Sequence, residues 1–207
     1  MNLLEAGNVH LWRGEQHVLR GLSIALGAGQ CLQLTGANGA GKSSLLRVLS
    51  GMLPMHEGSL RWRGRDVTRH ALPLQGECAF LGHRSGLKAE LSALENLRYL
   101  CGVRRDCTAT EIVAVLNRTG LDSSAHQRPL RELSAGQQRR VALARVAMQS
   151  AALWLLDEPA ANLDSAGQSL VHELLSDHLL GGGVAVVATH QTLALEEHSL
   201  QHLELAA

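Results

Sequence analysis

A glycine-rich segment in the first quarter of the chain has the residue types that hold phosphate groups. Residues 36–43 read Gly-Ala-Asn-Gly-Ala-Gly-Lys-Ser and match the pattern G-x-x-x-x-G-K-[ST]. Glycines let successive backbone N–H groups turn toward phosphate oxygens, and the N-terminus of a following helix adds partial positive charge. Lys42 would reach the β- and γ-phosphates, and the Ser43 hydroxyl would ligate Mg²⁺. The residues predicted to hold the phosphates are Gly36, Ala37, Asn38, Gly39, Ala40, Gly41, Lys42, Ser43 and Ser44.

Two acidic residues end an apolar segment late in the chain. Residues 152–156 read Ala-Leu-Trp-Leu-Leu and are followed by Asp157 and Glu158. In open parallel sheets, ligands bind at the carboxyl ends of the strands, so Asp157 is placed to hold Mg²⁺. Glu158, one residue further on, can orient or deprotonate an attacking water. With Lys42, these residues predict hydrolysis of a nucleoside triphosphate.

The elements that must position these residues change type along the chain. Apolar strand patterns precede the glycine-rich turn and return at the end, and the middle of the chain is helical. These patterns predict an α/β fold in one domain, residues 1–207, with an N-terminal antiparallel β-lobe and a helical insertion over roughly residues 87–150. The expected strands cover residues 3–12, 18–26, 30–35, 59–63, 78–81, 152–156 and 184–189, and helices are expected at 42–50, 91–149 (with breaks) and 166–180.

Composition excludes several classes of protein. The 19 Lys and Arg residues balance 19 Asp and Glu residues, which argues against a nucleic-acid footprint. Three Trp, one Tyr and one Phe are too few for a stacking platform for single strands. We expect no signal peptide and no membrane-spanning segment. The cysteines form no C-x-x-C pair and are expected to be reduced and buried: Cys31, Cys78, Cys101 and Cys107.

Three further segments resemble the motifs of ATP-binding-cassette (ABC) ATPases. Residues 133–140 read Leu-Ser-Ala-Gly-Gln-Gln-Arg-Arg and resemble the L-S-G-G-Q signature, with Ala135 in place of a glycine. Residues 161–164, Ala-Asn-Leu-Asp, resemble the D-loop, and Thr189-His190 resembles the switch histidine. The resemblance covers essentially the whole chain. It implies a P-loop NTPase fold of the ABC nucleotide-binding type, with ATP and Mg²⁺ bound between two copies of the chain.

The resemblance also assigns roles to single residues. Ser134, Gly136 and Gln137 begin a helix, which is an anion site, and in the family this site caps the γ-phosphate bound to the opposite subunit; Ser134 also fits a plain N-cap residue. His190 would contact the γ-phosphate or the attacking water and couple to Glu158. Asp164 is either a helix N-cap, a D-loop residue at the dimer interface, or both.

Two positions need a closer comparison with the family pattern, Trp12 and His83. An aromatic near the N-terminus usually stacks on adenine, and Trp12 lies at that place, although it could instead pack within the β-lobe. His83 stands where the family has a glutamine, and imidazole is a poor ligand for Mg²⁺. We expect His83 to act through water or phosphate, or at the subunit interface.

Finer resemblance concerns one group within the family. The Gly82-His83 loop, residues 91–97 and the Thr-His-Gln end closely resemble the ATP-binding subunit of the bacterial cytochrome c biogenesis ABC complex, the haem exporter. This implies a peripheral position on the cytoplasmic face of the inner membrane and integral membrane subunits as partners, contacted by Arg84, Leu87, Lys88 and Leu91. ATP would power haem export or release of a haem-loaded chaperone. An ABC subunit for another cargo and a soluble, non-transport ABC ATPase are the alternatives.

Basic residues outside these motifs have a simpler interpretation. Arg61, Arg63 and Arg65, at period two, are expected to line one solvated strand face. Arg139 and Arg140 are expected on a solvated face of the signature helix.

Overall fold

The computed structural model describes residues 2–69, 72–101 and 107–206. Their contacts divide the chain into two compact units. The first comprises residues 1–80, 151–158 and 175–207, and the second comprises residues 81–150 and 159–174. No helix among the described residues is both long enough and apolar enough to cross a bilayer.

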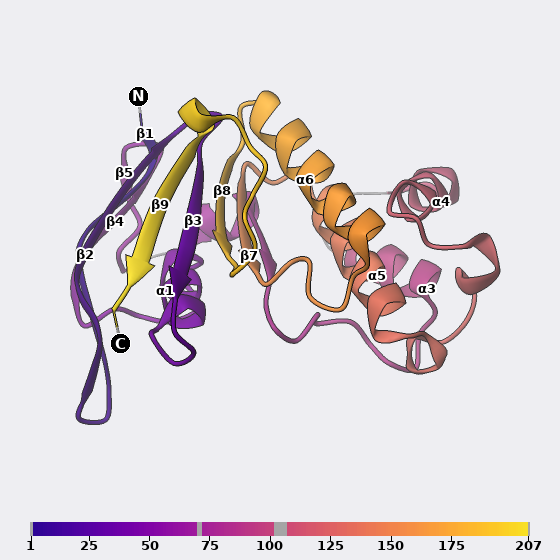
Figure 1. Cartoon of the computed structure of the whole chain (residues 1–207), viewed down its shortest axis with the longest axis horizontal. Helices are drawn as coiled ribbons and strands as arrows, with labels where there is room; N and C mark the ends of the chain where they lie inside the picture. The colour runs from indigo at the N-terminus through magenta and orange to yellow at the C-terminus, as the bar shows by residue number, and fades with distance from the viewer. Residues whose placement is uncertain (1, 70–71, 102–106, 207) are drawn as a thin grey trace. The chain divides into compact units, whose positions relative to one another are not determined.

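An antiparallel sheet begins the first unit. It has the order β2-β1-β4-β5, formed by β1 (Asn2–Arg13), β2 (Gln16–Gly27), β4 (Glu57–Trp62) and β5 (Arg65–Asp66). The strand patterns predicted before residue 30 are confirmed by the long β1–β2 hairpin (Figure 1). The expectation that three arginines share one strand face is wrong. The strand β4 ends at Trp62, Arg63 lies in the following turn with φ +50°, and Arg65 belongs to β5.

A second sheet contains the strands that precede the predicted site residues. Its order is β6-β7-β8-β3-β9, and the pairs β7–β8, β8–β3 and β3–β9 are parallel. Figure 1 shows β9, β3, β8 and β7 side by side in that order. Every residue of β7 and β8 is buried, which is why both strands read as continuous apolar runs. The strands are β3 (Cys31–Gly36), β6 (Cys78–Leu81), β7 (Leu153–Asp157), β8 (Val184–Ala188) and β9 (Leu200–Leu205).

One apolar core joins both sheets to the helix α1 (Lys42–Leu49). Leu45, Leu46 and Leu49 of α1 are completely buried, and they share this core with Leu4 of β1 and Leu155 of β7. A short helix, α2 (Leu72–Glu77), which the sequence patterns did not predict, precedes β6. The core therefore fixes the start of α1 against the ends of β3 and β7.

The second unit is helical and has its own core. Ala93, Leu97, Ile112, Leu116, Leu130, Val141 and Ala144 are among the buried residues that form it. The predicted breaks near residues 120 and 129 coincide with turns and two short 3₁₀ segments, whereas the break predicted near Gly102 lies outside the described residues. The elements here are α3 (Ala93–Cys101), α4 (Ala109–Arg118), η1 (Ser123–Ala125), η2 (Leu130–Glu132) and α5 (Ala135–Met148); α6 (Ser165–Leu180) has residues in both units, and η3 (Glu197–Ser199) belongs to the first.

Candidate nucleotide-binding site

The glycine-rich loop connects β3 to the first turn of α1. Gly36, Gly39 and Gly41 have φ values of +130°, +88° and +104°, a region that residues with a side chain rarely adopt. A Cβ on Gly41 would also lie 2.8 Å from Cγ1 of Val18. The loop therefore requires glycine at these positions, and its conformation brings the start of α1 directly after the strand.

The Lys42 side chain folds back over this loop. Its Nζ donates to the carbonyl oxygens of Gly36 at 2.6 Å and Ala37 at 3.1 Å, and the residue is 8% exposed. An ammonium held over a loop of glycine N–H groups can pair with a phosphate group that enters the loop.

Two oxygen atoms that could bind a metal lie together where α1 begins and β7 ends. The Ser43 hydroxyl donates to Oδ2 of Asp157 at 2.6 Å, across 114 residues of sequence. Asp157 ends β7 and is 7% exposed. Hydroxyl and carboxylate oxygens are the ligands that Mg²⁺ prefers, and Mg²⁺ is commonly completed by nucleotide phosphates and water. The donor set at this position therefore fits Mg²⁺.

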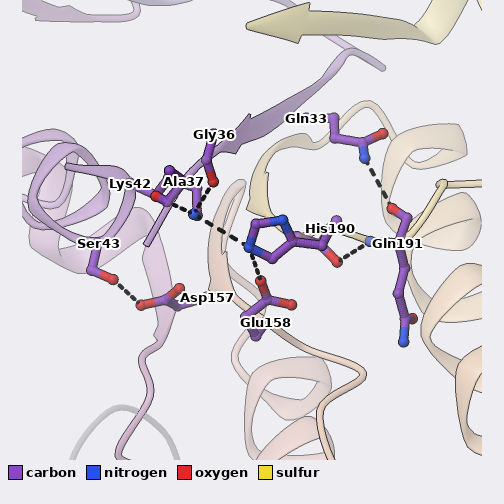
Figure 2. A network of polar contacts seen from close by, with 10 residues as sticks. Gln33, Gly36, Ala37, Lys42, Ser43, Asp157, Glu158, His190 and Gln191 are labelled. Carbon is purple, nitrogen blue, oxygen red and sulfur yellow. Dashed lines mark hydrogen bonds and ion pairs between the residues drawn. The ribbon is translucent and has the colours of Figure 1, made fainter. Parts of the chain in front are cut away.

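Glu158 and His190 follow two neighbouring strands, β7 and β8. Glu158 has φ +46°, which is strained for a residue with a side chain, and its N–H donates to the Ala188 carbonyl at 2.8 Å. Nε2 of His190 lies 3.7 Å from Oε1 of Glu158 and 3.4 Å from Nζ of Lys42. Figure 2 shows the three side chains pointing toward one another. The strand ends thus bring together a cation, a carboxylate and an imidazole.

Trp12 lies on β1, in register with His17 on β2. The two rings stack at 4.1 Å with an interplanar angle of 6°, and His56 approaches the indole edge at 5.4 Å. The backbone N–H of Trp12 donates to Nδ1 of His56 at 3.3 Å. Trp12 is only partly buried. The indole therefore lies at the surface of the sheet, in contact with His17 and His56.

The signature residues begin α5 in the second unit. Ser134 is the N-cap: its Oγ accepts from the Gln137 N–H at 3.2 Å, and Oε1 of Gln137 accepts from the Ser134 N–H at 2.9 Å. A Cβ on Gly136 would lie 2.9 Å from the Asn162 carbonyl oxygen. Glycine at this position therefore permits close approach of the segment that contains Asn162.

Asp164 accepts two hydrogen bonds through Oδ1. One comes from the Gly167 N–H at 2.9 Å, next to the start of α6, and one from Nη2 of Arg140 at 3.0 Å. The expectation of a solvated face for Arg139 and Arg140 is wrong. Arg139 is 8% exposed and donates to the carbonyl oxygens of Pro159 and Gly82, because α5 is enclosed on most of its circumference.

The segment that begins at His83 is exposed at its start and fixed further on. His83, Arg84 and Lys88 are exposed, and Nζ of Lys88 lies 3.9 Å from the centre of the Tyr99 ring. Asn96, 2% exposed, holds this segment: Oδ1 accepts from the Lys88 N–H at 2.7 Å, and Nδ2 lies 3.0–3.1 Å from the carbonyl oxygens of Lys88, Leu91 and Ser92. Sequence reasoning missed Asn96, and an asparagine between apolar helix positions was its only signal.

The fold and these residues define an ATP-binding cassette, and comparison with known proteins agrees. A family profile described as "ABC transporter" matches residues 19–161. Among solved structures, a dimeric cassette in a post-hydrolysis state bound to ADP and Pi has a TM-score of 0.83 at 23% identity, covering 91% of this chain and 88% of that one. A dimeric bacterial ABC transporter cassette has a TM-score of 0.85 at 21% identity, with 98% and 94% covered. The chain belongs to the ABC transporter family.

Several curated relatives of this chain are named "Cytochrome c biogenesis ATP-binding export protein CcmA". The protein with this name (CcmA 2) from Cupriavidus metallidurans is 48% identical, with 94% of this chain and 92% of the relative covered. The relative from Methylococcus capsulatus is 47% identical, with 87% of both chains covered. The relative from Vibrio vulnificus is 35% identical, with 98% and 99% covered. Within the ABC family, the chain groups with these export proteins.

Proposed function

We propose that this chain is the ATP-hydrolysing subunit of a bacterial ABC complex for cytochrome c biogenesis, which powers haem export or the release of a haem-loaded chaperone. The observation that carries the ATPase is the convergence of Lys42, Ser43, Asp157, Glu158 and His190 at neighbouring strand ends. The name shared by relatives of 35–48% identity supports the link to cytochrome c biogenesis.

The site residues divide the hydrolysis between them. The loop N–H groups and Lys42 hold the β- and γ-phosphates and offset their negative charge. Ser43 and Asp157 would hold Mg²⁺, which supplies charge neutralisation at the phosphates when bound. Glu158 orients and deprotonates the attacking water, and His190 binds the γ-phosphate or that water while its ring faces the Glu158 carboxylate.

The remaining predicted residues bind the adenine ring or contact the nucleotide held by a second copy of the chain. Trp12 stacks on adenine with one face, because His17 covers the other. The helix start at Ser134, Gly136 and Gln137 binds the γ-phosphate held by a second copy, and Asp164 lies at the interface of the two copies. Two solved cassettes of the same fold are described as dimeric, which supports the dimer but not its orientation.

The surface of the helical insertion, residues 87–150, connects the ATPase to its partners. Arg84, Leu87, Lys88 and Leu91 contact integral membrane subunits, which places the chain peripherally on the cytoplasmic face of the inner membrane. His83 adjoins this segment and transmits the state of the nucleotide to it, through water or phosphate. Asn96 keeps the segment in one conformation by its hydrogen bonds to Lys88 and Leu91.

Single substitutions in the purified full chain test the ATPase. Glu158→Gln keeps the shape of the side chain but loses the base, so hydrolysis falls about 10²–10⁴-fold while ATP is retained in a dimer. Lys42→Ala abolishes ATP binding or turnover. Glu173→Gln, an exposed glutamate on α6, is the matched control and behaves like the parent chain. Hydrolysis by Glu158→Gln at the parent rate would remove Glu158 as the base.

A further inference from the structure

One buried polar side chain in the central sheet has no role in the site described above. Gln33 lies in the middle of β3 and is 4% exposed. Its Nε2 donates to the Gln191 carbonyl oxygen at 2.9 Å, which joins residues 158 positions apart. Figure 2 shows the amide of Gln33 directed at the residue that follows His190. We propose that Gln33 is a positioning residue for ATP hydrolysis, which fixes the His190 loop against β3. This inference rests on the proposed function.

Packing alone does not explain why a glutamine occupies position 33. Its strand neighbours Leu32 and Leu34 are buried and apolar, and Val187 lies in register with it on β8. The Oε1 atom of Gln33 is buried, and no hydrogen-bond partner for it occurs in the described part of the chain. Burying an unpaired carbonyl oxygen opposes folding, so an apolar side chain would suit the sheet better. Among the described residues, the hydrogen bond of this amide leads to the catalytic loop.

The hydrogen bond to Gln191 completes a short series that holds the loop after β8. The Thr189 N–H donates to the Leu34 carbonyl at 3.1 Å, and the Gln191 N–H donates to Oγ1 of Thr189 at 3.1 Å. Gln33 holds the carbonyl of Gln191, so the backbone is fixed on both sides of His190. The acceptor is a backbone carbonyl, so the nitrogen of the Gln33 amide must face it.

Backbone anchoring matters here because packing does not hold the His190 ring. The side chain is 56% exposed, yet Nε2 must lie within contact distance of Glu158 and Lys42. An error of about 1 Å in the placement of a catalytic group lowers rates strongly. Loss of the Gln33 hydrogen bond would leave the loop free to sample other positions. Nucleotide binding through the glycine-rich loop and Trp12 would be unaffected.

The test uses the purified full chain with Gln33→Met, which keeps the length of the side chain but removes the amide. We expect kcat for MgATP to fall about three- to tenfold, the range of one lost hydrogen bond, with KM changed less than twofold. The thermal midpoint stays equal or rises, because a buried unpaired oxygen is removed. Gln201→Met is the matched control: Nε2 of this glutamine on β9 donates to the Ala25 carbonyl and lies 3.4 Å from Oε1 of Gln30. Neither partner belongs to the catalytic loop, so kcat stays at the parent value.

A second variant, Gln33→Glu, keeps the size of the side chain and makes the donor depend on pH. The protonated carboxyl donates to the Gln191 carbonyl, whereas the carboxylate repels it. The kcat ratio of variant to parent therefore falls as pH rises through the pKa of the new carboxyl, which burial raises. His202, in register on β9, and the His190–Glu158 pair are the same in both proteins, so the ratio of variant to parent isolates the change at residue 33.

The outcomes separate this inference from the proposed function. Parent-like kcat in Gln33→Met, or a pH-independent ratio in Gln33→Glu, overturns the positioning role. A fall in kcat matched by a lower thermal midpoint and a raised KM also overturns it, because that pattern marks a structural role. If Glu158→Gln and Lys42→Ala both hydrolyse ATP at the parent rate, the proposed function itself fails, whatever Gln33→Met does.

Discussion

Asn96 offers the sharpest prediction about the helical unit, because one side chain holds a whole loop. Its amide accepts one hydrogen bond and faces three carbonyl oxygens with two N–H groups, so it makes the equivalent of about three hydrogen bonds. At about 1 kcal/mol each, Asn96→Ala removes about 3 kcal/mol of stability. Alanine returns about 0.5 kcal/mol through its higher helix propensity. The net loss is about 2.5 kcal/mol.

This loss corresponds to a thermal midpoint lowered by roughly 5–10 °C for a chain of this length. The assay is thermal unfolding of the purified full chain followed by circular dichroism or calorimetry. Asn117→Ala is the matched control, since Asn117 is exposed on α4 of the same unit and its replacement is expected to change the midpoint by less than about 2 °C. Equal midpoints for the two variants would refute the role given to the buried amide.

Three further predictions concern the first unit. A Cβ on Gly183 would overlap the imidazole of His178, so Gly183→Ala lowers the free energy of unfolding in urea by about 1–3 kcal/mol; a parent-like midpoint would contradict the crowding. Burial lowers the pKa of His178, against opposing backbone hydrogen bonds, so its contribution to stability is complete above about pH 6.5 and declines as pH falls below that value. Urea midpoints measured at pH 5 and pH 7.5 check this. The difference between the two midpoints should be smaller in His178→Gln than in the parent chain. Burial raises the pKa of Cys31 to about 12, so this thiol resists alkylation at pH 8 in the native chain while Cys107, half-buried, reacts; mass spectrometry showing equal labelling would contradict it.

The phosphate loop and the acidic strand end could be predicted because their signals are local. Gly41 and Lys42 are consecutive residues of the glycine-rich motif, at the start of α1. The apolar run before Asp157 indicates a strand that is covered on both faces. The structure adds what spacing could not give, the hydrogen bond between Ser43 and Asp157 across 114 residues. Strand ends in a parallel sheet meet at one edge, so the family pattern and the sheet topology lead to the same cluster.

Two failures of the sequence reasoning, at Arg139 and at Gln33, have one physical origin, which is that long-range backbone acceptors leave no pattern in the sequence. Arg139 looks like a solvated helix residue, yet its guanidinium donates to the carbonyl of Pro159, 20 residues away, and to that of Gly82. Gln33 resembles an ordinary strand residue until its partner, Gln191, is known. Periodicity identifies apolar faces, but it does not show which buried polar groups find partners.

The measurement that tests the central claim most directly is covalent haem in periplasmic c-type cytochromes of a strain that lacks this chain. The deletion should abolish covalent haem attachment. The parent gene should restore it, and Glu158→Gln, expressed at the same level, should not. Normal c-type cytochromes in the deletion strain would contradict the role in cytochrome c biogenesis, and full restoration by Glu158→Gln would contradict the coupling of that role to ATP hydrolysis.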